Sequence, residues 1–234
     1  MIEPTSQPAG SLSALPHAQP AEGFPLGEPL LYLRAITPRP RNTIMCTVEN
    51  VYDQQIAVIQ PLTDISAGRI ASEIRFVVAG TNGAPILYLT RFGGRGQWQG
   101  KMMQISDAHG SEIGWMRPTS PVAQFYRTHG LTFSLEANQR TLGATDVPTG
   151  AALRQRTKPT PIVDHTGVEI ARIQRQQLHR GDYGRYRKYW SDYLLDCPQP
   201  LPHPLPIMLL ASAFTQYLYE QFDQGGWQMG LMEW

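Results

Sequence analysis

A basic and aromatic segment, residues 172–188, is the strongest candidate for chemistry in this chain. Its cations, set against the single carboxylate of Asp182, are Arg172, Arg175, Arg180, Arg185, Arg187 and Lys188. Cations of this kind attract anionic lipid headgroups, and rings such as those of Tyr186 and Trp190 settle at a membrane interface. The same mixture suits nucleic-acid phosphates and bases, and a solvated loop before the final strand is the third interpretation. Because the whole chain carries a net charge of only +1, polyanion binding must come from such a patch, and we favour lipid over nucleic acid.

A second, weaker candidate is the glycine-rich segment 93–101. Its glycine spacing fits neither of the common phosphate-binding loops, so we expect a flexible hairpin loop. Arg95 and Lys101 would still extend a basic face, and Trp98 at the tip of this loop would dip into a membrane.

Asp192 and Asp196 are the candidate metal ligands. Calcium prefers six to eight oxygen ligands, so two carboxylates on one strand are a sparse set, and ordinary solvation at a strand end is the alternative. Calcium is the one cofactor that the sequence leaves open. The chain has no HExxH or GxSxG motif and no local signature of a Cys–His pair, so we name no catalytic residues and find no hydrolase, transferase or oxidoreductase motif. An enzyme whose site is assembled from residues distant in the sequence stays open as an alternative.

Short hairpin units must position these candidates. Residues 105–116 and 162–173 match at five of twelve positions, and both contain an Asp-x-x-Gly turn between alternating apolar runs. Weaker versions of this unit occur near Asp53, Asn82 and Asn138. Each unit predicts two strands, and five units with their flanking runs give about twelve strands, which is enough to close an antiparallel barrel. A β-propeller is the competing architecture, but the units are irregularly spaced.

A hydrophobic segment follows the last predicted strand. Five prolines precede it, so a helix can begin only near Pro206 and is expected over about 206–222. This helix is apolar on nearly every face and must be buried, either in the barrel or in a membrane. Its sixteen or so residues reach about 24 Å, less than the roughly 30 Å of a bilayer core, so the length favours the barrel.

The ends of the chain differ from its middle. Residues 1–28 are rich in Pro, Ser, Ala and Gly and are expected to be a disordered arm, and residues 224–234 form a tail with Trp227 and Trp234. No secretory signal is visible in the first residues, and Cys46 and Cys197 stand far apart, which favours a reducing, cytoplasmic setting. We expect one folded domain, residues 29–223, between the arm and the tail.

The Asp-x-x-Gly-x-Glu-Ile hairpins, followed by Trp190 and then the 206–222 helix, resemble the phospholipid scramblase and LURP-one-related family of the tubby C-terminal-like superfamily. This resemblance spans about residues 29–223. It implies a closed β-barrel around a central hydrophobic helix, in agreement with the length of the helix. It also implies calcium-dependent movement of phospholipids between leaflets for scramblase-like members, and binding of phosphoinositides for tubby-like members.

Two departures from the family weaken the transfer of scramblase activity. The cysteine cluster used for palmitoylation has no counterpart here, and the acidic calcium segment is reduced to Asp192 and Asp196. We therefore carry two hypotheses. The first is a lipid-binding protein, peripheral at the inner face of the plasma membrane. The second is a soluble adaptor that binds another protein through residues 1–28 or 224–234.

Overall fold

The computed structural model describes residues 23–36, 44–62, 73–93, 102–120, 130–148, 158–183 and 186–224, without the side chains of 177–190 and 221–224. These residues form twelve strands, a short 3-10 helix and one α-helix. The elements are η1 (Pro25–Gly27), β1 (Leu30–Ala35), β2 (Cys46–Glu49), β3 (Gln55–Pro61), β4 (Glu73–Gly80), β5 (Pro85–Phe92), β6 (Met102–Asp107), β7 (Glu112–Pro118), β8 (Gly130–Ala137), β9 (Arg140–Pro148), β10 (Thr160–Asp164), β11 (Glu169–Tyr183), β12 (Tyr186–Asp196) and α3 (Leu205–Gln224).

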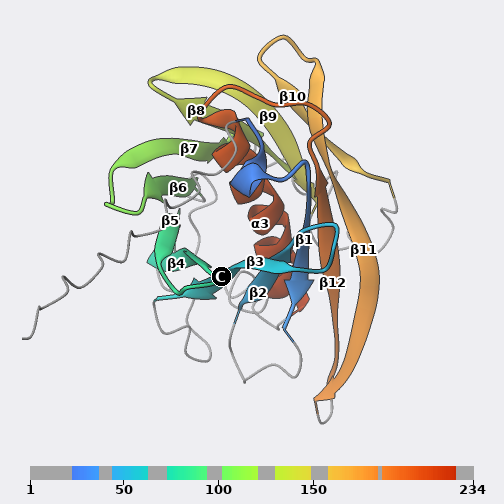
Figure 1. Cartoon of the computed structure of the whole chain (residues 1–234). Helices are drawn as coiled ribbons and strands as arrows, with labels where there is room; N and C mark the ends of the chain where they lie inside the picture. The colour runs from blue at the N-terminus through green and yellow to red at the C-terminus, as the bar shows by residue number, and fades with distance from the viewer. Residues whose placement is uncertain are drawn as a thin grey trace, which may run out of the picture.

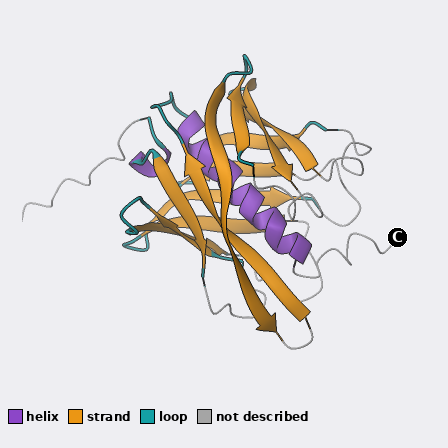
Figure 2. Ribbon diagram, turned by 90° about the vertical axis from the view of Figure 1, so that its right-hand side faces the viewer, coloured by secondary structure: helices purple, strands orange, loops and turns teal. Residues whose placement is uncertain are grey.

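The strands close into a single antiparallel barrel. Each strand pairs with its neighbours in the sequence, and β1 completes the ring by pairing with both β2 and β12. Closure leaves the sheet without an exposed edge along the body of the barrel. Figures 1 and 2 show the ring of strands around α3. The predicted barrel of about twelve strands around a C-terminal helix is therefore confirmed.

Helix α3 is buried because nearly every one of its faces is apolar. All side chains from Met208 to Glu220 are buried, as expected for a helix with no polar face to offer to water. The helix begins one residue before Pro206, whose missing N–H costs nothing in a first turn. Among the described residues, no helix combines the length and apolarity that crossing a membrane requires.

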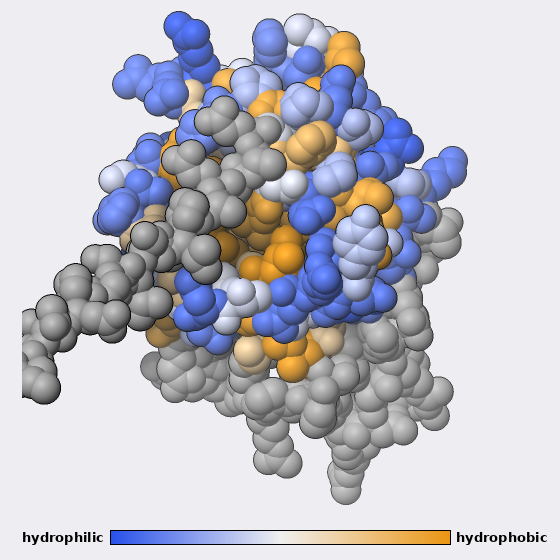
Figure 3. Space-filling view, in the orientation of Figure 1, coloured by the Kyte–Doolittle hydropathy of each residue, from blue (hydrophilic) through white to orange (hydrophobic). Residues whose placement is uncertain are grey.

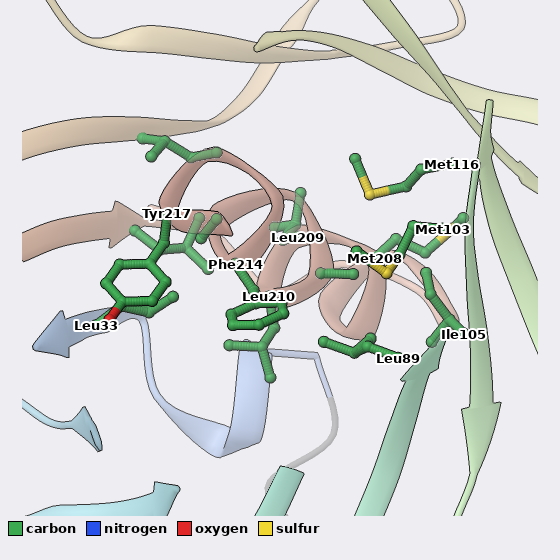
Figure 4. Close-up of a cluster of buried hydrophobic side chains, with 14 of the residues drawn as sticks. Leu33, Leu89, Met103, Ile105, Met116, Met208, Leu209, Leu210, Phe214 and Tyr217 are labelled. Carbon is green, nitrogen blue, oxygen red and sulfur yellow. The ribbon is translucent and has the colours of Figure 1, made fainter. Parts of the chain in front are cut away.

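The side chains of α3 interlock with the inward-facing residues of the strands, as Figure 4 shows. The Phe214 ring meets Phe76 edge to face, with 4.9 Å between the centroids. The Tyr217 hydroxyl donates to the Met45 carbonyl at 2.7 Å. On the other side of the helix, Met208 lies near Met103 and Met116, and thioethers of this kind fill irregular gaps in a core. The barrel interior is thus a packed core.

The segment 23–28, which the sequence assigns to a disordered arm, belongs instead to the folded domain. Phe24 and Leu26 pack against the core, Pro25 is buried, and η1 contacts α3. The Leu201 amide donates to the Gly23 carbonyl at 2.6 Å. These apolar residues cover the end of the barrel where α3 begins. Figure 3 shows this face, with apolar side chains at its centre inside a ring of hydrophilic ones. Residues 1–22 lie outside the described residues.

The two best-matching sequence segments form the same hairpin turn. In each turn the aspartate carboxylate accepts two backbone N–H groups, which come from His109 and Ser111 for Asp107, and from Thr166 and Val168 for Asp164. The glycine that ends each turn has a positive φ, 85° at Gly110 and 87° at Gly167, which glycine adopts without strain. The Asp-x-x-Gly spacing thus has a direct structural cause.

Candidate functional site

Strands β11 and β12 continue past the barrel as a two-stranded ribbon (Figures 1 and 2). β10 is in register with β11 only between Glu169 and Ile173, and β1 with β12 only between Tyr193 and Asp196. From Leu178 to Ser191 the two strands are in register only with each other, among the residues that the structure describes. We call residues 178–183 and 186–191 the ribbon. Six residues at about 3.3 Å each extend it roughly 20 Å.

Most of the basic and aromatic segment lies on this ribbon. Arg180, Tyr186, Arg187, Lys188 and Trp190 occupy its two strands, and the register sets Arg187 opposite Asp182 and Arg180 opposite Tyr189. Arg185 lies outside the described residues. The segment that one of the three interpretations takes as a solvated loop therefore lies on two paired strands, and its aromatic residues suit such a ladder.

The ribbon concentrates positive charge. The two ribbon strands contain three cations and one carboxylate, and with Arg185 between them residues 178–191 carry a net charge of +3 in a chain whose total is +1. The remaining residues therefore carry a net charge of −2. Residues 178–191 are therefore a basic segment in a chain whose other residues together are slightly acidic, which makes the charge distribution asymmetric.

We call the place where the ribbon leaves the barrel, residues 175–178 of β11 and 191–193 of β12, the root of the ribbon. A buried carboxylate on α3 binds the root from the side of the core. Glu220 is fully buried, and its Oε1 accepts from Arg175 Nη2 at 2.6 Å and from the Ser191 hydroxyl at 3.0 Å. Its Oε2 accepts from the Ser191 amide at 3.1 Å and from the Tyr193 hydroxyl at 3.0 Å. Burial, with a further contribution from the Glu220 charge, raises the pKa of the Tyr193 phenol well above its ordinary value, so Tyr193 remains a donor. The carboxylate is thus saturated with donors, as a buried charge must be.

A second carboxylate, on β12, binds the end of β1 beside the root. Asp192 is buried, and its Oδ1 accepts the Ala35 amide at 3.0 Å, where β1 parts from β12. Arg34 lies beside it, with Nη1 3.9 Å from Asp192 Oδ2, and binds Glu49 at 2.6 Å and Asp53 at 2.7 Å. Partial burial opposes the charge of Arg34, but the bonds to Glu49 and Asp53 outweigh it and raise the pKa of this guanidinium. At the place where the β1–β12 pairing ends, the Asp192 side chain thus accepts the Ala35 amide of β1.

Four residues that the sequence analysis predicts as lipid or metal ligands instead contact other protein groups, at the root or on the adjoining part of the barrel. Arg175 points inward to Glu220 with its side chain only 17% exposed, so it is withdrawn from any surface ligand. Arg172 lies on the outer face, 2.9 Å from Glu169 and 3.9 Å from Asp196, which partly neutralises it. Asp192 and Asp196 are four positions apart on an extended strand, which corresponds to roughly 13 Å.

The predicted calcium ligands therefore do not converge. In the described part of the chain, no three His, Cys, Asp or Glu side chains come together as a metal site would require. Arg95, Trp98 and Lys101 lie outside the described residues.

The sequence analysis does not name Glu220 as a site residue, although its position in the sequence indicates that its side chain needs partners. It is the first Asp, Glu, Lys or Arg after Asp196, and it lies in a helix that is apolar on nearly every face. A carboxylate on such a helix must find a buried cation or several donors. The sequence indicates the need for partners, but the partners Arg175, Ser191 and Tyr193 come from two other strands.

Comparisons with known proteins do not show a family for this chain. No protein-family model matches it, and no curated protein matches its sequence. An X-ray structure of a protein from Arabidopsis thaliana aligns with 84% of this chain and 95% of its own, at 10% sequence identity and a TM-score of 0.43. A likeness this distant carries no argument about function.

Proposed function

We propose that this protein is a membrane-associated, scramblase-like lipid-binding protein, and that the ribbon binds anionic phospholipid headgroups. The observation that carries the proposal is the concentration of positive charge on a ribbon that extends beyond the strands flanking it: its two strands carry a net charge of +2, and Arg185 between them adds one more cation. A projecting element can reach a flat surface before the rest of a rounded barrel does. The proposal places the protein at the cytoplasmic face of the plasma membrane as a peripheral protein.

The expected affinity follows from the charge. Each Lys or Arg near an anionic surface contributes about 1 kcal/mol, so the three cations of the ribbon strands together with Arg185 supply about 3–4 kcal/mol, equivalent to a Kd of roughly 1–6 mM. Tyr183, Tyr186, Tyr189 and Trp190 would strengthen this by partitioning to the headgroup region. Binding is therefore expected to be weak, reversible and sensitive to salt.

The packing of the barrel favours binding at the surface over binding in the interior. The side chains of α3 fill the space inside the strands, and Leu209, Phe214 and Tyr217 are fully buried there. A lipid chain would have to displace this core. The proposal therefore assigns the headgroup to the ribbon, and any movement of lipid between leaflets to the membrane beside it.

Sedimentation with vesicles tests the proposal. Wild-type protein is mixed with phosphatidylcholine vesicles, with or without phosphatidylserine, at low and high salt and with or without calcium. A ribbon variant, Arg185→Gln/Arg187→Gln/Lys188→Gln, is compared with a control that removes three exposed barrel cations, Arg75→Gln/Arg140→Gln/Lys158→Gln. The ribbon variant should bind anionic vesicles about 100-fold more weakly, and the control should bind nearly as well as wild type.

Two results would overturn the proposal. Equal weakening of both variants would show a nonspecific effect of net charge. Absence of binding to every vesicle would leave the soluble adaptor as the working hypothesis, to be tested by deleting residues 224–234 and measuring recovery of a protein partner.

A further inference from the structure

We propose that Glu220 is a positioning residue, whose carboxylate fixes the direction in which the ribbon leaves the barrel. Only the expected effect of Glu220 on lipid binding rests on the proposed function. The geometric part concerns the coupling of α3 to two strands and can be tested in the absence of any lipid.

The root of the ribbon needs such a support. The β11–β12 register shifts between Arg175 and Leu178, so that the two residues of β11 after Arg175 lie opposite Asp192 alone. A bulge of this kind interrupts the ladder and increases the local twist. Past the bulge the ribbon has no third strand among the described residues, and an isolated two-stranded hairpin is only marginally stable. Backbone pairing alone therefore defines its direction poorly.

Glu220 spans this weak point. It binds Arg175 on the barrel side of the bulge in β11, and it binds both the amide and the hydroxyl of Ser191, the ribbon residue of β12 that adjoins the barrel. Arg175 Nε also donates to the Ser191 hydroxyl. One carboxylate on α3 thus links the two strands to each other and to the core at the place where they leave the barrel.

The chemistry of the site requires a carboxylate. Four donors, on Arg175, Ser191 and Tyr193, converge on its two oxygens. A glutamine has the same shape but would present an NH₂ group to two of these donors and leave Arg175 without its counter-charge. Glu220→Gln should therefore disturb the root with little change in volume.

The same helix offers a matched control. Gln216 lies one turn earlier in α3 and donates to the Asp146 carbonyl of β9 at 3.1 Å. Gln216→Leu removes a buried polar contact between α3 and the barrel on a strand that does not border the ribbon. If Glu220 merely anchors the helix, the two substitutions should have similar effects.

Hydrogen exchange followed by mass spectrometry decides between these roles. Amides of residues 178–190, none of which bonds to Glu220 in the described contacts, are compared with amides of β2–β6 in wild type, Glu220→Gln and Gln216→Leu. Glu220→Gln should speed exchange in the ribbon by about tenfold and leave β2–β6 unchanged, and Gln216→Leu should not change the ribbon. Unchanged ribbon exchange in Glu220→Gln, or equal acceleration of ribbon and barrel, would overturn the inference.

A second variant keeps the test decisive if Glu220→Gln fails to fold. Tyr193→Phe removes one donor and preserves the Arg175–Glu220 pair, and it should speed exchange in the ribbon alone by a smaller factor. Identical exchange in Tyr193→Phe and wild type would then overturn the inference.

Vesicle sedimentation separates this inference from the proposed function. Glu220→Gln should bind phosphatidylserine vesicles several-fold more weakly than Gln216→Leu, although every ribbon cation is retained. If wild type binds no vesicles, the proposed function fails while the exchange experiment still decides the role of Glu220. If wild type and Glu220→Gln bind equally and exchange equally, the positioning role fails while the proposed function stands.

Discussion

Strands β11 and β12 run through both the body of the barrel and the ribbon, but their surroundings differ in the two regions. In the body, Ile173, Tyr193 and Leu195 are buried toward α3, and each strand has a neighbour on both sides. In the ribbon, the strands are in register only with each other and carry three of the chain's cations, Arg180, Arg187 and Lys188. The change occurs at the bulge between Arg175 and Leu178.

This difference separates stability from binding. Burial of apolar side chains around α3 supplies most of the free energy of folding, whereas the ribbon is a ladder of only two strands among the described residues. Substitutions in the body should therefore change the free energy of unfolding, and substitutions in the ribbon should change binding to anionic surfaces.

The largest expected effect is in the core of the body. Phe214→Ala removes a fully buried ring that packs on Phe76, and it should lower the free energy of unfolding by about 3–5 kcal/mol. Arg187→Gln/Lys188→Gln in the ribbon should change it by less than about 0.5 kcal/mol. Urea denaturation followed by circular dichroism measures both. If the ribbon variant lost as much free energy of unfolding as Phe214→Ala, the separation of stability in the body from binding in the ribbon would be wrong.

Thiol labelling tests how tightly the body is closed. Cys46 and Cys197 are both buried and form no disulfide, and burial raises the pKa of the Cys197 thiol to about 11. At pH 8 both thiols should react with a labelling reagent at least about a hundredfold more slowly than in urea-unfolded protein, because labelling requires local opening. Rapid labelling of native protein would show that the barrel opens more readily than its packing indicates.

A single added methyl group in the wall of the barrel should have a moderate effect. A side chain at Gly143 of β9 would overlap the Val163 carbonyl of β10, so Gly143→Ala should cost about 1–3 kcal/mol. Thr141→Ala on the same strand is the control, since Thr141 is exposed. Thermal unfolding compares the two, and equal melting temperatures would contradict the close approach of β9 and β10.

The smallest expected effect concerns a hairpin turn of the body. Hydrogen bonds, the largest from the Thr166 hydroxyl, lower the pKa of Asp164 below its ordinary value of 3.8. The ionised carboxylate therefore contributes stability above pH 3.8, and this contribution is lost as the pH falls through the lowered pKa of the folded state. Asp164→Asn should reduce the loss of stability between pH 7 and pH 2, measured by urea denaturation. An unchanged pH dependence would show that the turn does not depend on the charge.

The sequence predicts the body well because its signals are local. Alternating apolar residues and the Asp107 and Asp164 turns predict hairpins without reference to the rest of the chain, and the all-apolar helix near Pro206 requires an enclosure. The sequence assigns segment 23–28 to the disordered arm, and not to the folded domain, because its composition resembles that of residues 1–22. Its burial depends on contacts with residues near Leu201, which are distant in the sequence.

The sequence predicts the candidate site only in part. It identifies the concentration of cations from Arg180 to Lys188, but it cannot show that β10 and β1 end early and leave these residues on a ribbon. It groups Arg175 with the surface cations, although a bulge and Glu220 turn this side chain to the interior. Asp192 resembles a metal ligand in the sequence, and its bond to the Ala35 amide becomes evident only when β1 and β12 are paired.

Hydrogen exchange of the full chain, with and without phosphatidylserine-containing vesicles, tests the central claim most directly. The account predicts that bound vesicles protect the amides of residues 178–191 and leave the strands of the opposite wall, β4–β7, unchanged. Protection of β4–β7 without protection of the ribbon would contradict it and place the membrane contact on the body of the barrel.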